Sequence, residues 1–149
     1  MKHQKLFEQL AARTLATAAD AFPMPKDFWA CDILEAEGLD LSEANYEVAE
    51  STLEWLHDEN FLRALGKGRG YDRTGVSHLE FRKSRLTVVG LDALNRTLDV
   101  SGETAGQKAG DLLVDQLKQS AGEARSAVIS EVIGTIIGSA AKVFLRPDG

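Results

Sequence analysis

The sequence predicts an α+β fold in which helices and a small β-hairpin follow one another along the chain, and three observations support this class. Apolar residues before residue 60 recur every three or four positions, which is the period of a helix with one buried face. Between residues 61 and 86 the period changes to alternation around a glycine-rich stretch, as in a hairpin. Helical periodicity then returns and continues into the C-terminal part of the chain.

Two helices are predicted before residue 40. The first covers residues 5–21 and ends before Pro23, because proline lacks a backbone N–H and restricts its predecessor. The second covers residues 26–37, with Gly38 as its stop. Their apolar residues are Phe7, Ala11, Leu15, Ala18 and Phe22 in the first, and Phe28, Trp29, Ile33 and Leu34 in the second.

The clearest apolar stripe follows in residues 43–60. Residues 39–41 alternate like a very short strand, and Ser42 is a good N-cap for the helix behind it. The segment is either one helix or two helices with a tight turn near Asn45, and the sequence leaves both open. Its apolar face consists of Tyr46, Ala49, Leu53 and Leu56.

A hairpin and a further helix complete the first part of the chain. Residues 61–65 and 76–81 are predicted as strands, with residues 66–70 as a flexible basic loop. Thr87 caps a helix that is predicted to reach Leu98.

The composition shifts after residue 99. Residues 100–110 are small and polar, and helices are predicted over residues 111–121 and 123–145. The chain is therefore expected to consist of a domain over residues 1–99, a glycine-rich linker over 100–110 and a helical tail over 111–149.

Two short segments carry a resemblance to a known fold. Residues 53–63 (LEWLHDENFLR) resemble the end of a winged-helix recognition helix that runs into the first wing strand. Residues 86–94 (LTVVGLDAL) resemble the segment after the wing in several bacterial winged-helix families: leucine-threonine, two residues, glycine, three residues, leucine. The resemblance covers about residues 26–98 and implies a winged-helix-like domain with a C-terminal helical extension. It points to a fold and to no particular family within it.

Charge is distributed in blocks along the chain. The net charge is −6, which argues against a surface covered in cations for nucleic acid. Residues 1–62 hold 4 basic and 13 acidic side chains, whereas residues 63–86 hold 7 basic and 2 acidic ones. This basic island is either a nucleic-acid contact through phosphates or a solvated hairpin whose charges protect a sheet edge. Its candidate residues are Lys67, Arg69, Arg73, Arg82, Lys83 and Arg85, joined by Arg63.

The helix before the hairpin carries the opposite charge. If its apolar stripe faces the core, Glu47, Glu50, Glu54 and Asp58 line the outer face. A helix-turn-helix protein lays that face into the major groove, where carboxylates cannot supply the cationic contacts that dominate affinity. The face is expected to be solvated or to dock a basic partner.

Small residues recur every fourth position in the predicted tail. On a helix they form a smooth stripe that lets a second helix approach closely. The sequence leaves three arrangements open: packing on the N-terminal domain, self-association, and membrane insertion. Glu131 and Lys142 interrupt the apolar run, so a membrane span is not favoured. The helix-association residues are Gly122, Ser126, Ser130, Gly134 and Gly138.

No enzymatic chemistry, cofactor or metal site is predicted. His3, His57, His78 and Cys31 show no ligand-like spacing, and the glycine-rich segment lacks the Gly-Lys-Ser/Thr end of a phosphate-binding loop. The single cysteine and the absence of a signal-peptide pattern favour a cytoplasmic location. The leading hypothesis is a non-enzymatic interaction or regulatory module that binds itself or a protein partner through the tail. The alternative is a DNA-binding regulator that contacts phosphates through the basic wing.

Overall fold

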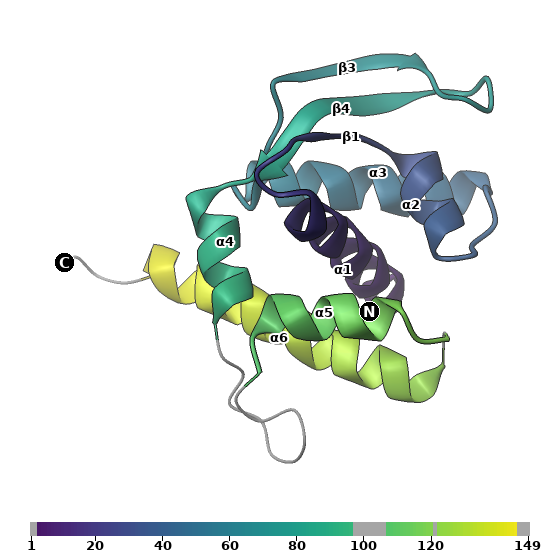
Figure 1. The fold of residues 1–149 in the computed structure, drawn as a ribbon. Coiled ribbons are helices and arrows are strands. Elements are labelled where there is room, and N and C mark those ends of the chain that lie inside the picture. Colours follow the sequence, from purple (N-terminus) through teal and green to yellow (C-terminus); the bar gives the residue numbers. More distant parts are fainter. Residues whose placement is uncertain (1–2, 97–106, 121, 146–149) are drawn as a thin grey trace.

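The computed structural model describes residues 3–96, 107–120 and 122–145, and they form a mixed helix-and-sheet fold. In Figure 1 the sheet lies over α1, α2 and α3, and α5 and α6 lie on the other side of α1. The helices are α1 (Gln4–Ala21), α2 (Ala30–Ala36), α3 (Glu43–Asp58), α4 (Val88–Asn95), α5 (Ala109–Leu117) and α6 (Glu123–Leu145). The strands are β1 (Lys26–Trp29), β2 (Leu62–Arg63), β3 (Gly66–Tyr71) and β4 (Ser77–Leu86).

Strand β4 organises the antiparallel sheet, because it pairs with each of the other three strands. Phe28 of β1 lies opposite Phe81, and both side chains are buried. The register with β1 shifts between Lys26 and Phe28. Near this irregularity Lys83 has a φ of 49°, and its N–H donates to Asp27 Oδ1 at 2.8 Å.

Three predicted elements are wrong. Residues 26–29 are strand β1 and not the start of a helix, because Phe28 and Trp29 pair with β4 and the helix begins only at Ala30. Residues 39–41 form no strand; Leu39 and Leu41 are half-buried against the core without a partner strand. The predicted loop at residues 66–70 lies in strand β3, and the turn of the hairpin falls at residues 72–76 instead.

The glycines of β3 explain why a loop-like sequence forms a strand. They alternate with Lys67, Arg69 and Tyr71, so one side of the strand carries no side chains. A Cβ at Gly66 would lie 2.8 Å from Arg82 Nη2, and one at Gly70 would lie 3.5 Å from the Trp29 ring. The side chains of β1 and β4 therefore lie across this strand where the glycines leave room.

The helix caps follow the sequence closely. Residues 43–58 form one helix, so the alternative of two helices is excluded. The Ser42 side chain accepts a hydrogen bond from the Asn45 N–H at 3.2 Å, and Thr87 accepts one from Gly90 at 3.0 Å. Both residues thus satisfy N–H groups that lack partners inside their helices.

The C-terminal helices share the core of the N-terminal ones. α5 and α6 pack against α1, and both also contact α4. Helix α5 begins at Ala109, two residues before the predicted start, and ends at Leu117. The helix capped by Thr87 is predicted to reach Leu98, which lies outside the described residues. Residues 100–106 of the predicted linker also lie outside them. The buried residues that α5 and α6 contribute are Ala109, Leu112, Leu113, Ile129, Val132, Ile133 and Ile136.

Buried polar contacts also connect α6 to the N-terminal helices. The Glu37 carboxylate is fully buried and lies 2.6 Å from Arg13 Nη2 and 3.0 Å from Arg125 Nη1. Burial alone would raise the pKa of Glu37, but hydrogen bonds from Arg125, Gln9 and Arg13 outweigh it and lower that pKa. Ser130 of α6 donates a further hydrogen bond to Glu8 of α1 at 3.1 Å.

Candidate interaction surfaces

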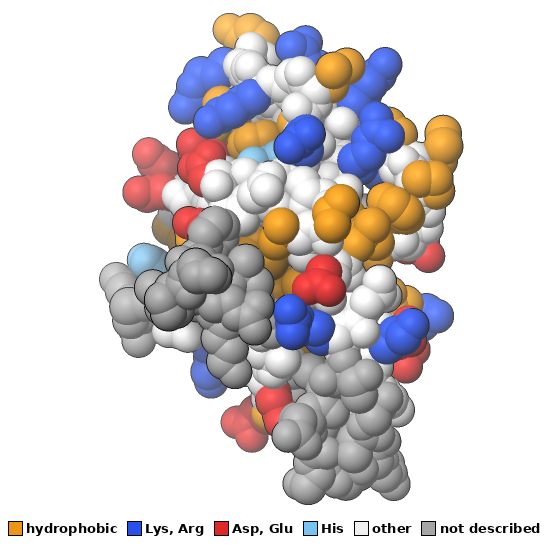
Figure 2. Space-filling model, turned by 90° about the vertical axis from the view of Figure 1, so that its left-hand side faces the viewer, with side chains coloured by type: hydrophobic (Ala, Val, Ile, Leu, Met, Phe, Trp, Pro, Cys, Tyr) orange, Lys and Arg blue, Asp and Glu red, His pale blue; other side chains and the backbone are white. Residues whose placement is uncertain are grey.

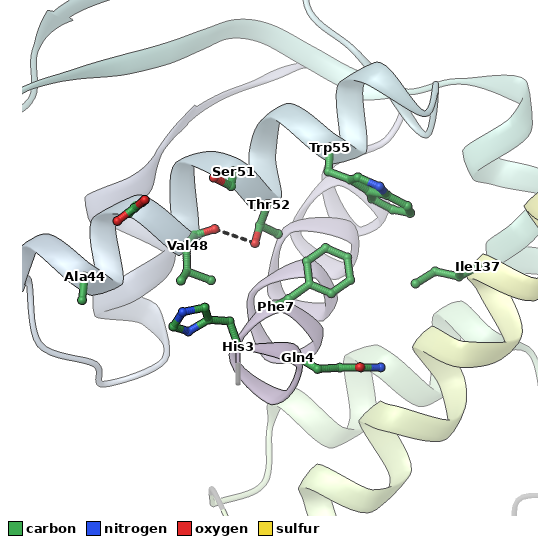
Figure 3. Close-up of a pocket in the computed structure, with 10 residues that line it drawn as sticks. His3, Gln4, Phe7, Ala44, Val48, Ser51, Thr52, Trp55 and Ile137 are labelled. Atoms are coloured by element: carbon green, nitrogen blue, oxygen red, sulfur yellow. Dashed lines mark hydrogen bonds between the residues drawn. The ribbon is translucent and has the colours of Figure 1, made fainter. Parts of the chain in front are cut away.

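An apolar groove opens between α1, α3 and α6. It has a volume of about 890 Å³, and we call it the α3–α6 groove. Phe7 and Trp55 meet edge to face in it, with ring centroids 5.4 Å apart, and Ile137 approaches from α6 (Figure 3). The Thr52 hydroxyl is turned to the Val48 carbonyl at 2.7 Å, so it adds little polarity to the wall. His3, Gln4, Glu47 and Ser51 also line the groove, so it offers an apolar surface with polar groups beside it.

Only the C-terminal end of the small-residue stripe, at Gly134 and Gly138, lies near Ile137 of this groove, whereas Gly122 and Ser126 line a smaller pocket between α1 and the start of α6. Gly134 is exposed and Gly138 is partly exposed, and they flank Ile137 in the sequence. A Cβ at Gly122, Gly134 or Gly138 would meet nothing within 4 Å. Ser126 is exposed, whereas Ser130 is partly buried against α1.

The hairpin covers part of the acidic face of α3. Glu50 Oε1 accepts a hydrogen bond from the Leu79 N–H at 2.8 Å and lies 3.0 Å from His78 Nδ1. Glu54 Oε2 lies 3.3 Å from Lys67 Nζ. Glu47 and Asp58 remain exposed. Of the four predicted carboxylates, two thus face solvent and two face the sheet.

The turn of the hairpin is fixed to the helices. Asp72 is 6% exposed and accepts hydrogen bonds from the Tyr46 hydroxyl at 3.1 Å and from the N–H groups of Thr74 and Val76. Arg73 forms ion pairs with Asp32 and Glu35 of α2. The cation at the tip of the hairpin therefore has carboxylates of the same chain as its partners.

The remaining cations lie on the sheet without ion pairs to described residues. Lys and Arg side chains gather over the upper part of the face in Figure 2, with hydrophobic side chains below and beside them. Arg63 and Arg85 are directly opposite each other on β2 and β4. Arg82 lies over Gly66, and Arg69 and Lys83 are exposed. Six predicted nucleic-acid residues therefore divide into two paired ones, Lys67 and Arg73, and four unpaired ones, Arg69, Arg82, Lys83 and Arg85.

Two of these four, Lys83 and Arg85, line a second groove together with Arg63, between β2, β4 and the start of α4. We call it the β2–α4 groove; it has a volume of about 560 Å³. Arg63, Lys83 and Arg85 line it together with Leu65 and Val88, which are 79% and 83% exposed. The sequence indicates the cations of this groove, but it does not indicate that Leu65 and Val88 are exposed beside them. Leu65 falls in a predicted strand and Val88 in a predicted helix, where apolar residues are usually buried.

The titratable groups in the interior favour structure over catalysis. Cys31 is fully buried, and burial, helped by Asp32 and Asp72, raises its thiol pKa to about 12. His57 is held between the Leu53 carbonyl, at 2.6 Å, and the Ser84 hydroxyl, at 2.7 Å. Burial lowers the pKa of His57, so it is neutral at pH 7. The described residues contain no group of three His, Cys, Asp or Glu side chains that is arranged to hold a metal ion.

Neither a test for membrane-spanning helices nor comparison with known proteins assigns a function to these surfaces. Among the described helices, none combines the length and the apolar composition that crossing a membrane requires. Searches against protein-family models, curated proteins and solved structures find no match to this chain.

Proposed function

We propose that the chain is a non-enzymatic interaction module that associates with a second copy of itself through α6 and the α3–α6 groove. The observation that carries this proposal is the contrast between two kinds of glycine. Gly90 and Gly110 sit where a Cβ would lie 2.3 Å from the Phe61 carbonyl oxygen and 3.2 Å from Leu94, so packing within the chain requires them. Gly134 and Gly138 have no such neighbour.

Those two glycines are costly if nothing approaches them. Each destabilises a helix by about 1 kcal/mol relative to alanine. Nothing described within the chain uses the space that they leave, whereas a second helix crossing α6 would use it for close backbone contact.

The α3–α6 groove supplies the apolar surface that such an association needs. Ile137 lies between the two glycines in the sequence and also lines the groove with Phe7 and Trp55. A partner helix on α6 would therefore bury groove residues and glycines together. Aromatic side chains in a central pocket are the usual energetic anchors of protein interfaces.

Sedimentation equilibrium of the full chain tests the proposal. We expect the mass to rise from monomer to dimer with concentration, and the double variant Gly134→Leu/Gly138→Leu to stay monomeric. Leucine is a better helix former than glycine, and both positions are open in the monomer, so the circular dichroism of the variant should keep its helical signal.

Ala124→Leu is the matched control, because it adds a leucine to an exposed position of α6 nearer its N-terminal end. It should dimerise like the wild type. A strictly monomeric wild type, or an unchanged dimer in the glycine double variant, contradicts the proposal.

A DNA-binding regulator is the second candidate function. The order helix, strand, two helices and hairpin supports a winged-helix arrangement, because the early strand β1 pairs with strand β4 of the hairpin. The unpaired Arg69, Arg82, Lys83 and Arg85 favour phosphate contact. Retardation of duplex DNA at low salt that is lost in Arg82→Ala/Arg85→Ala and kept in the ion-paired Arg73→Ala would support it. A cytoplasmic location remains part of both candidates.

A further inference from the structure

We propose that the β2–α4 groove binds an acidic, amphipathic protein segment, with carboxylates on its three cations and aliphatic side chains on Leu65 and Val88. This inference does not rest on self-association, since it concerns a different set of residues. Cations and large apolar side chains without partners in the described chain lie together in this groove.

The charge of the groove is one-sided. Arg63, Lys83 and Arg85 line it, no Asp or Glu does, and none of the three cations has an ion pair with a described residue. Other hairpin cations behave differently: Lys67 and Arg73 pair with carboxylates of α3 and α2. The partial positive charge at the N-terminal end of α4 adds to the same field. The complement of this surface is a segment with several negative charges.

Leu65 and Val88 distinguish between the two classes of acidic partner that the charge alone would permit, DNA and protein. Leu65 and Val88 are among the most exposed large apolar residues of the described chain, at 79% and 83%. A DNA backbone offers phosphates and sugars, so it would leave both side chains without apolar contact. A protein segment with leucine or valine between its carboxylates covers both side chains and neutralises the cations at once.

Hydrogen bonds within the chain join the two walls of the groove. The Thr87 N–H donates to the Phe61 carbonyl at 3.1 Å, which joins the start of α4 to the start of β2. The Thr87 hydroxyl has one hydrogen to donate, and the Asn60 and Phe61 carbonyls both lie within its reach; Gly90 packs against Phe61. A partner therefore loses little affinity to ordering of the groove.

Lys83 offers the sharpest test variant. Its φ of 49° lies in the left-handed region, where a lysine is strained and glycine is not. Lys83→Gly should leave the melting temperature equal to or above that of the wild type, while it removes one of the three cations. A binding defect in this variant consequently cannot come from a damaged fold.

Fluorescence anisotropy of the full chain with a labelled synthetic peptide measures the interaction. The peptide contains glutamates with two leucines one helical turn apart. We expect saturable binding that weakens with salt, and a loss of roughly two- to fivefold in affinity in each of Lys83→Gly and Arg85→Gln. Val88→Ser should weaken binding without changing the salt dependence, because it removes only apolar contact.

Arg73→Gln is the matched control, since Arg73 is an exposed hairpin cation outside the groove, and it should bind like the wild type. So should Gly134→Leu/Gly138→Leu, which separates this inference from self-association. No binding at low salt overturns the proposal, as does equal binding of a peptide whose leucines are replaced by serine. Tighter binding of duplex DNA or of anionic lipid vesicles through the same cations also overturns it.

Discussion

Asp72 shows how much a single side chain can hold in place. Its carboxylate accepts from the Thr74 hydroxyl, from two N–H groups of the hairpin turn and from the Tyr46 hydroxyl. Burial alone would raise the pKa of Asp72, but these hydrogen bonds lower it to about 2. The ionised side chain therefore fastens the turn to α3.

Asp72→Ala should lower the free energy of unfolding by about 1–3 kcal/mol at pH 7, because four donors lose their acceptor. The folded-state pKa of about 2 lies below the ordinary value of 3.8, so ionised Asp72 stabilises the fold above about pH 4. The difference between wild type and variant should shrink as pH falls from about 4 to 2. Urea titrations across this range measure it, with the exposed Asp58→Ala as the control. A difference that is independent of pH would contradict the assignment.

Cys31 is expected to be unreactive in the folded protein. Its thiol is fully buried and its pKa is raised to about 12, chiefly by burial, so almost no thiolate exists at pH 8. Ellman's reagent should label the native protein only as fast as it unfolds, and the guanidinium-unfolded protein at once. Rapid labelling of the native protein would show that α2 does not cover the thiol as described.

Gly90 lies where α4 packs closely against the Phe61 backbone, just before β2. An added Cβ would lie 2.3 Å from the Phe61 carbonyl oxygen, a distance that forces the backbone to move. Gly90→Ala should therefore lower the free energy of unfolding by roughly 1–3 kcal/mol. Gly68→Ala is the control, because a Cβ there meets nothing within 4 Å, and thermal melting should place it near the wild type.

The elements differ in how far the sequence predicts them. Helices α1 and α3 follow from their apolar stripes, and the Ser42 and Thr87 caps follow from residue type, since both signals are local. Strand β1 does not, because its pairing partner Phe81 lies more than fifty residues away. The sequence around Phe28 contains apolar residues that suit a short helix equally well, and only the distant strand decides between them.

The sequence predicts which charged residues the candidate surfaces contain, but it does not predict which of them form ion pairs. The acidic helix and the basic island are visible in the sequence as separate charge blocks. That Glu54 meets Lys67 and that Arg73 meets α2 depends on how the hairpin lies over the helices. Leu65 and Val88 become a feature only when β2 and α4 are placed side by side.

At the scale of the whole molecule, Glu37 connects the C-terminal helix to the first two. Glu37→Gln removes the charge opposite Arg13 and leaves Arg125, which is 7% exposed, without a carboxylate. Breaking a buried pair from one side costs about 3–5 kcal/mol. Urea unfolding should show this loss, and hydrogen exchange should show that α6 is less protected.

Glu35→Gln is the matched control for that variant. Glu35 pairs with Arg73 at the surface, two residues from Glu37, and an exposed pair contributes at most about 1 kcal/mol. Similar losses in the two variants would mean that Glu37 is no more important to the fold than a surface carboxylate.

The position of β4 in the chain has a consequence for biosynthesis. Every pairing in the sheet involves β4, so no strand has a partner until the ribosome has synthesised residues 77–86. Before then β1 can only remain unpaired or follow the helical tendency of its neighbours, while α1 and α3 can already pack together. The sheet therefore cannot begin to form until that segment is present, after the segments of α1 and α3 have already been synthesised.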